Sequence, residues 1–301
     1  MKQVKDKFLT YSIIIPVSNR PEGLQTTLRG VFATRQPENT VRNEVVVVND
    51  GSWPDVSKVI ATHPQSEKIT EVTLPEQSGP ATARNRGVEK STGDWLVFFD
   101  DGMEIPDDWL EKAMDYTADY DYLAFDYKLK PRKGEGAVEK LFRLSNFRFE
   151  SLLKEKDFGG TGGLMVRRYI FDKVGGFNEK ALIYMDDWTF GKEVKKCGGI
   201  QAFVSEMRII HKAKTLPQMI KEKERKISHN LKFKEKGTEK YWIKKGNNKR
   251  CKALLKVVFL SNHPLQKESK LSKLTFLYAY FCFHCLMLFL KIKVRLRNSH
   301  V

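Results

Sequence analysis

The sequence has little cysteine, and its four cysteines do not form a recognisable framework. They are Cys197, Cys251, Cys282 and Cys285. The last two have the spacing of a metal-binding pair, but they lie in an apolar, aromatic run and no second pair accompanies them. A structural zinc site takes four ligands, and a disulfide-stapled fold needs cysteines placed regularly along the chain. The sequence therefore favours neither kind of protein.

A long apolar segment is missing from the N-terminal end of the sequence. Residues 1–10 are basic and polar, so they lack the apolar centre of a secretory signal. We therefore expect residues 1–215 to be cytoplasmic. A dinucleotide-binding fingerprint is missing as well, because the glycine-rich run at residues 159–163 precedes a predicted strand and does not join a strand to a helix.

Acidic residues are scarce in the last part of the chain. Residues 216–301 contain 21 Lys and Arg against 5 Asp and Glu, whereas residues 1–215 contain 32 of each sign. The formal net charge of +16 thus lies entirely in the last 86 residues. So abrupt a change in charge predicts two regions, a domain at 1–215 and a basic helical tail at 216–301.

Short apolar runs alternate with helical patterns in the first region. Strands are predicted at residues 11–17, 44–50, 69–74, 95–99, 122–127 and 203–211, and helices at 21–33, 106–116 and 137–153. Apolar runs without polar alternation are typical of strands that are buried on both faces, as in a parallel sheet. The sequence therefore predicts an α/β fold with a mostly parallel sheet flanked by helices.

Two adjacent carboxylates, Asp100 and Asp101, follow the apolar strand at residues 95–99. The carboxyl end of a strand is where open α/β sheets hold their ligands. These carboxylates could bind a divalent cation that neutralises a diphosphate, or they could cap a helix. We favour ligand binding, because charges at the end of a buried strand are costly unless they meet water, a cation or a hydrogen-bond donor.

Other polar groups follow the neighbouring elements. Asp50 could accept hydrogen bonds from a nucleobase or a ribose, although the Asn-Asp-Gly-Ser sequence at 49–52 is also good turn chemistry and favours a turn when it is taken alone. Arg84 and Arg86 stand near a predicted helix N-terminus, where amide and guanidinium groups both favour a diphosphate.

A second pair of carboxylates, Asp186 and Asp187, precedes a helical pattern that ends at Cys197. One of them could serve as a general base, and one could cap the helix. His211 ends an apolar strand, and most lone histidines in such places are not metal ligands. Considered one at a time, these residues leave both alternatives open.

Seven segments, taken in their order and spacing, are more specific than any single motif. They lie at residues 13–19, 47–52, 79–87, 96–101, 162–168, 174–179 and 186–187. In this arrangement the first 215 residues resemble the family 2 glycosyltransferases, which have the GT-A fold and use nucleotide sugars.

The resemblance implies a role for each matching position. The residues that would hold the nucleotide sugar are Pro16, Val17, Asn19, Asn49, Asp50, Arg84, Asp100 and Asp101. The residues that would border the acceptor are Gly160, Thr161, Gly162, Gly163, Asp186 and Trp188. Asp187 falls on the family's catalytic base. Asp101 and His211 fall on its metal site, which would take Mn²⁺ or Mg²⁺.

The chain departs from the family's pattern beside the first pair of carboxylates. The third position of the Asp-x-Asp signature, usually the principal metal ligand, is Gly102. Either Asp101 or Glu104 then takes the metal, or metal binding is weakened. A milder change is Thr189, which stands where another acid is common in the family.

The activity that the resemblance implies is inverting transfer of a sugar from a nucleoside diphosphate, most commonly UDP, to a hydroxyl. The acceptor would be a glycan or a lipid-linked molecule in cell-surface polysaccharide synthesis. The alternatives are a non-catalytic protein that binds sugar nucleotides or polyanions, and a nucleotidyltransferase, which the proline-containing sequence at 16–22 disfavours because a glycine-rich phosphate loop is needed there. No nucleic-acid-binding module is recognisable, so we expect no nucleic-acid partner.

The basic tail contains an apolar segment at residues 274–290, with 17 residues that carry no formal charge. Lysines and arginines flank it on both sides, and about 20 apolar residues are needed to span a bilayer. The segment could lie on an anionic membrane surface, pack on the protein or span the membrane. We rank the membrane surface first, because the flanking cations would bind anionic lipid. The expected location is therefore peripheral, at the inner face of the cell membrane.

Overall fold

The structure is a computed structural model that describes residues 8–52, 56–141, 143, 163–180, 186–213, 215–221, 223–224, 227 and 272–298. Contacts between residues divide the chain into two compact units. The first consists of Met1–Lys130 and Leu152–Lys212, and the second of Pro131–Ser151 and Ala213–Val301. The predicted acceptor residues Gly160, Thr161 and Gly162 lie outside the described residues, as does the predicted helix beyond residue 143.

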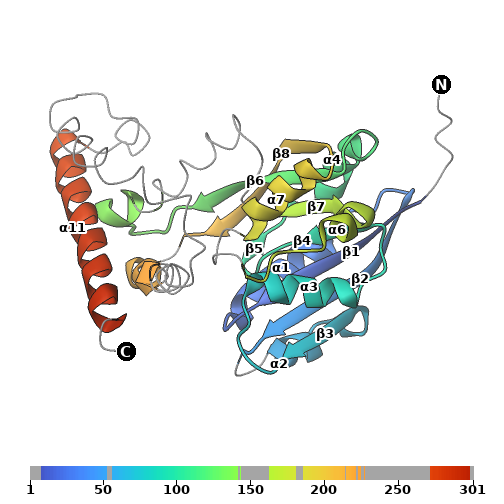
Figure 1. The fold of residues 1–301 in the computed structure, drawn as a ribbon, viewed down its shortest axis with the longest axis horizontal. Coiled ribbons are helices and arrows are strands. Elements are labelled where there is room, and N and C mark those ends of the chain that lie inside the picture. The colour runs from blue at the N-terminus through green and yellow to red at the C-terminus, as the bar shows by residue number, and fades with distance from the viewer. Residues whose placement is uncertain are drawn as a thin grey trace. The chain divides into compact units, whose positions relative to one another are not determined.

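The described part of the first unit is built around one sheet of eight strands (Figure 1). In chain order the strands are β1 (Leu9–Val17), β2 (Thr40–Asp50), β3 (Ile69–Leu74), β4 (Trp95–Phe98), β5 (Met103–Glu104), β6 (Tyr122–Lys130), β7 (Leu164–Arg167) and β8 (Gln201–Lys212). Their order across the sheet is β3-β2-β1-β4-β7-β6-β8-β5.

The sheet has a parallel part and a part that contains antiparallel strands. Strands β3, β2, β1 and β4 are parallel, so their carboxyl ends meet at one edge. Strand β7 runs antiparallel between β4 and β6, and β8 is parallel to β6. The short β5 pairs antiparallel with β8. The α/β class predicted from the alternating apolar runs is confirmed.

Six helices of the first unit cover the sheet, counting only described residues. They are α1 (Pro21–Ala33), α2 (Val56–Ala61), α3 (Pro80–Glu89), α4 (Trp109–Thr117), α6 (Arg168–Val174) and α7 (Asp186–Lys196). Proline stands in the first turn of α1 and of α3, where its missing N–H costs nothing and its fixed φ suits a helix. The prediction of a helix at residues 21–33 is therefore confirmed to the residue.

Two apolar clusters lie on the two faces of the sheet, because side chains alternate along each strand. Ile13 and Ile15 of β1 join the cluster that α1, α2 and α4 complete, and Ile14 joins the cluster under α3, α6 and α7. Both faces of β1 are consequently buried, which explains why its sequence is an unbroken apolar run.

The second unit includes helix α11, at Lys273–Asn298. Its residues Phe276 and Ala279 form a small buried cluster with Leu141. Within the described residues, α11 is the one helix that is long and apolar enough to cross a membrane by length and composition, over Leu274–Val294. Length and composition alone are weak grounds for a membrane span.

Candidate active site

The turn that follows β4 is fastened to helix α1 by one buried side chain. The hydroxyl of Thr27 donates to the carbonyl oxygen of Asp100 at 3.0 Å and accepts from the amides of Gly102 and Met103, each at 3.0 Å. The amide of Gly102 also donates to the carbonyl oxygen of Gly23 at 3.0 Å. The backbone that carries the carboxylates of Asp100 and Asp101 is therefore held in place. Thr27 carries no signal in the sequence, because a hydroxyl in the middle of an amphipathic helix is common.

The ends of β1 and β2 form a connected polar loop. The side-chain oxygen of Asn49 accepts from the amide of Ser52 at 2.9 Å. The hydroxyl of Ser52 donates to the carbonyl oxygen of Val17 at 3.2 Å and accepts from the amide of Asn19 at 2.7 Å. The structure thus brings together the predicted nucleotide-binding residues at 16–19 and 49–50, with the side chain of Asn19 exposed.

Asp50 is buried at the end of β2, and its carboxylate holds the loop that enters α3. It accepts hydrogen bonds from the backbone amides of Ser78 at 2.6 Å and Gly79 at 3.1 Å. Gly51 permits this arrangement, because its φ is +59° and a Cβ atom there would lie 2.3 Å from the amide nitrogen of Gln77. Asp50 therefore positions the backbone of the loop before α3, at the edge of the sheet where a nucleotide is predicted to bind.

Arg84 lies at the centre of a buried charge cluster. One guanidinium nitrogen donates to Asp100 at 2.7 Å and the other to Asp186. Burial by itself would lower the pKa of Arg84, but the carboxylates of Asp100, Asp186 and Asp187 outweigh this effect and raise it above its usual value. The guanidinium therefore stays charged and links the two acidic motifs, which lie far apart in the sequence. The resemblance implied a place for Arg84 near the diphosphate, and in the structure both of its terminal nitrogens are held by carboxylates.

Asp186 and Asp187 occupy the first turn of α7, where the helix dipole favours negative charge. Asp186 is buried against Arg84, whereas Asp187, the next residue, is half-buried. Asp187 is close enough to Tyr122 to add to the effect of burial, which raises the pKa of that tyrosine. Trp188 follows in the same turn, and its side chain lies outside the described part of the chain.

The predicted metal residues Asp101 and His211 lie side by side. Strand β5 pairs with β8 so that Met103 stands opposite His211. This pairing places Nε2 of His211 3.1 Å from the carbonyl oxygen of Asp101. The carboxylate of Asp101 accepts a hydrogen bond of 2.8 Å from Nη1 of Arg20, a residue that sequence analysis did not single out. Glu104, the alternative metal ligand, lies 3.4 Å from Nζ of Lys130.

Gly102 has a φ of +85°, so it adopts a backbone conformation that favours glycine. A Cβ atom there would lie 2.9 Å from Nη2 of Arg20 and 3.2 Å from Nε2 of His211. Both groups therefore face the space that an aspartate side chain would enter at this position.

Asp101 and His211 are the described residues that could bind a divalent cation here. Among the described residues, no group of three or more His, Cys, Asp or Glu side chains is arranged to hold a metal. One carboxylate and one imidazole nevertheless suit Mn²⁺ or Mg²⁺ when a diphosphate supplies further oxygens, because these ions commonly take few protein ligands beside substrate phosphates. Asp101 and His211 fit such a site, provided that Arg20 leaves the carboxylate.

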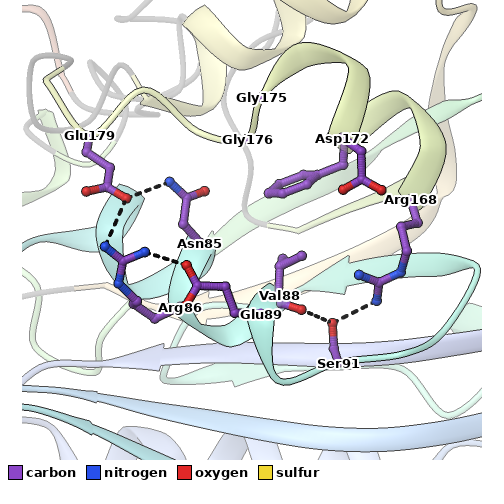
Figure 2. A pocket seen from close by; sticks show the side chains of 11 residues that line it. Asn85, Arg86, Val88, Glu89, Ser91, Arg168, Asp172, Gly175, Gly176 and Glu179 are labelled. Atoms are coloured by element: carbon purple, nitrogen blue, oxygen red, sulfur yellow. Dashed lines mark hydrogen bonds and ion pairs between the residues drawn. The ribbon is translucent and has the colours of Figure 1, made fainter.

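A separate pocket lies between α3 and α6 (Figure 2). It has a volume of about 530 Å³, and it is lined by Arg86, one of the two arginines considered above for a diphosphate. Its two arginines already have partners: Arg86 lies 2.5 Å from Glu89, and Arg168 donates to the hydroxyl of Ser91 at 2.9 Å. We assign no ligand to this pocket. Gly163, the one residue of the predicted acceptor segment 160–163 that is described, is buried, and a Cβ atom there would lie 2.5 Å from Cδ1 of Ile209.

Comparison with known proteins identifies a family for this chain. Residues 12–175 match the family described as Glycosyl transferase family 2. Glycosyltransferase AglE of Haloferax volcanii is 26% identical over 213 residues, which are 70% of this chain and 69% of that protein.

Two solved structures share the fold. The mannosyltransferase PcManGT from Pyrobaculum calidifontis, in complex with GDP-Man and Mn²⁺, has a TM-score of 0.55 at 16% identity over 96% of this chain and 74% of its own. TarS of S. aureus, in complex with UDP-GlcNAc, has a TM-score of 0.52 at 18% identity over 74% of this chain and 66% of its own. Both likenesses concern the fold, which is GT-A as the resemblance implied.

Proposed function

Because the chain belongs to glycosyl transferase family 2, we propose that it transfers a sugar, with inversion, from a nucleoside diphosphate to a hydroxyl of a glycan or lipid-linked acceptor. The observation that carries this proposal is the Arg84 cluster. It joins Asp100, at the end of β4, to Asp186 and Asp187, at the start of α7. The proposed donor edge and the proposed base would thereby lie next to each other.

The donor would bind along the carboxyl ends of β1, β2 and β4, as ligands do in open α/β sheets. The loop formed by Asn19, Asn49 and Ser52 would contact the nucleoside, and the diphosphate would extend toward Asp100 and Asp101. A divalent cation held by Asp101 and His211 would supply positive charge for the departing diphosphate.

Asp187 is the better candidate for the base. The carboxylate of Asp186 is buried and engaged by Arg84, so it cannot easily approach an acceptor. Asp187 is half-buried at the start of the same helix. We propose that its carboxylate takes the proton of the acceptor hydroxyl while that oxygen bonds to the anomeric carbon and the bond from this carbon to the diphosphate breaks. The two adjacent aspartates thus have different roles, one structural and one chemical.

Substitution of Asp187 tests this assignment. Asp187→Asn should lower the rate of transfer by about 10²–10⁴-fold, which is the usual contribution of a general base. Donor binding should change little, because the base acts on the acceptor. A thermal-shift panel of UDP-sugars and GDP-sugars identifies the donor first, since a ligand that prefers the native state raises the unfolding temperature. Normal turnover by Asp187→Asn would show that another group is the base.

Helix α11 supports a proposed location at an anionic membrane surface. Its exposed apolar side chains recur every three or four positions and so share one face of the helix: Leu274, Tyr278, Phe281, Leu288, Ile292 and Leu296. A different face, with Phe276, Ala279, Leu290 and Val294, is buried within the second unit. The exposed apolar face and the cationic residues at 291–297 together suit an interfacial helix on anionic lipid. A membrane-bound transferase would meet a lipid-linked acceptor at that surface.

Sedimentation with vesicles checks this location. The full chain should bind vesicles that contain phosphatidylserine and bind neutral vesicles much less. Replacing Tyr278, Phe281 and Leu288 together by serine should weaken binding, because burial of their apolar area is lost. A triple serine variant that binds as the wild type does, or a full chain that stays in solution with either vesicle, would contradict the location.

A further inference from the structure

We propose that Arg20 occupies the metal-binding carboxylate of Asp101 while the donor is absent, and that it moves onto the donor diphosphate when donor and cation arrive together. The proposal rests on the proposed function, since it assumes that a nucleoside diphosphate binds at this edge of the sheet. It concerns Arg20, to which neither the motifs nor the resemblance gave a role.

The first support is the position of the guanidinium. Its Nη1 atom donates to the carboxylate of Asp101 at 2.8 Å. Its Nη2 atom lies 2.9 Å from the place of a Cβ atom on Gly102, and Nε2 of His211 lies 3.2 Å from the same place. The guanidinium therefore lies beside the pair of groups that suit a divalent cation. A cation bound to Asp101 and His211 would be repelled by Arg20 unless the arginine withdrew.

The second support is the freedom of Arg20 to withdraw. Its side chain is 41% exposed, whereas that of Asp101 is 10% exposed and is fixed by the turn that Thr27 holds. The bound cation would replace the positive charge of Arg20 beside Asp101, so the exposed guanidinium can exchange one anion for another without leaving that carboxylate uncompensated. A diphosphate offers such an anion, and guanidinium groups bind phosphate oxygens well.

The third support is that Arg84, the other arginine at this edge, is already paired with carboxylates of the protein. Both terminal nitrogens of Arg84 are held by the carboxylates of Asp100 and Asp186 in a buried cluster. Turning Arg84 toward a diphosphate would leave Asp186 buried without its partner, which is costly. Arg20 follows directly on the segment 16–19 that is proposed to contact the nucleoside, so it is the arginine that can reach the diphosphate without breaking a buried pair.

Cooperative binding follows from this exchange. In the wild type, a diphosphate that draws Arg20 away removes a competing positive charge from Asp101, so that each ligand increases the affinity for the other by the same factor. Without Arg20 this competition is absent from the start, and much of the coupling disappears. The glycine at position 102 is consistent with the exchange, because it leaves room for the arginine where other members of the family carry a carboxylate.

Isothermal titration of Mn²⁺ into the full-length protein, without and with saturating UDP or GDP, tests the proposal. Arg20→Met removes the guanidinium and keeps most of the side-chain length. It should bind Mn²⁺ alone on the order of 10-fold more tightly than the wild type, which corresponds to the loss of one charge-assisted hydrogen bond to Asp101. It should bind the nucleotide more weakly and show a smaller coupling factor. Arg20→Lys, which keeps the charge, should lie between the two.

Arg35→Met is the matched control. Arg35 is an exposed arginine whose guanidinium lies 3.5 Å from Asp107 and 3.4 Å from Glu111, so its loss changes net charge equally without touching Asp101. Thermal unfolding verifies that each variant is folded. The proposal is overturned if Arg20→Met and the wild type bind Mn²⁺ alone with equal affinity, or if neither binds it detectably. It is also overturned if Arg35→Met gains as much affinity for Mn²⁺ as Arg20→Met does. Because no sugar is transferred in this experiment, failure of the proposed activity would appear separately, in the transfer assay.

Discussion

Replacing Arg84 by methionine should destabilise the first unit strongly. The guanidinium is 7% exposed and is bonded to Asp186, whose side chain is 5% exposed, and to the more exposed Asp100. Removing one partner of a buried ion pair leaves an uncompensated buried charge, at a cost of ~3–5 kcal/mol. Total stabilities of domains are about 5–15 kcal/mol, so a large part of the stability would be lost.

Urea unfolding followed by tryptophan fluorescence measures this loss, since Trp95 and Trp109 are buried in the first unit. With an m-value of about 2.5 kcal/mol/M, the midpoint should fall by roughly 1–2 M. Arg86→Met is the control on the same helix, because Arg86 is 42% exposed and its pair with Glu89 should contribute less than ~1 kcal/mol.

A second variant separates the buried charge from the packing. Combining Arg84→Met with Asp186→Leu removes both charges and should recover at least half of the lost stability, because an apolar pair often replaces a buried ion pair without loss. If Arg84→Met shifted the midpoint no more than Arg86→Met does, the cluster would not be the structural link that its geometry indicates.

Two further substitutions probe the backbone that supports the site. Thr27→Val should lower the free energy of unfolding in urea by about 2–3 kcal/mol, because the amide of Met103 and the carbonyl oxygen of Asp100 lose their bonds to a fully buried hydroxyl. An unchanged stability would contradict this account. Gly51→Ala should lower the free energy of unfolding by more than ~2 kcal/mol and weaken nucleotide binding in a thermal-shift assay, since its Cβ would meet backbone atoms. Gly198→Ala is the control, because Gly198 has a φ of +84° and open space around the Cβ position. It should lower the free energy of unfolding by about 1 kcal/mol and leave nucleotide binding unchanged.

Much of the fold could be predicted because its signals are local. The apolar run of β1 reflects burial on both faces, and the proline at residue 21 marks the start of α1. Strand β5 was missed, because two residues are too few to show a periodicity. The antiparallel direction of β7 could not be predicted either, since strand patterns carry no information about pairing direction.

The site was only partly predictable, for a related reason. Residues at strand ends were found because parallel strands bring their carboxyl ends to one edge. The pairs Arg84–Asp186 and Arg20–Asp101 were not predicted, because their members lie 102 and 81 residues apart along the chain. The place of Arg84 near a helix N-terminus suggests from the sequence that it binds an anion, but not which one. The tertiary structure determines that these anions are carboxylates of the protein itself. The roles of the individual site residues stay predictions that the variants above test.

The pairing of β5 with β8 has a consequence for biosynthesis. His211 lies 110 residues after Asp101, and only the addition of β8 to the sheet brings the two together. At translation rates of ~5–20 residues per second, roughly 5–20 s pass between the synthesis of these two residues. During that interval a nascent chain can already assemble β1 to β4, whose carboxyl ends carry residues predicted to bind the nucleotide, before His211 has been synthesised. We therefore expect ribosome-bound chains that end before β8 to lack the proposed cation site, which would form only late in synthesis.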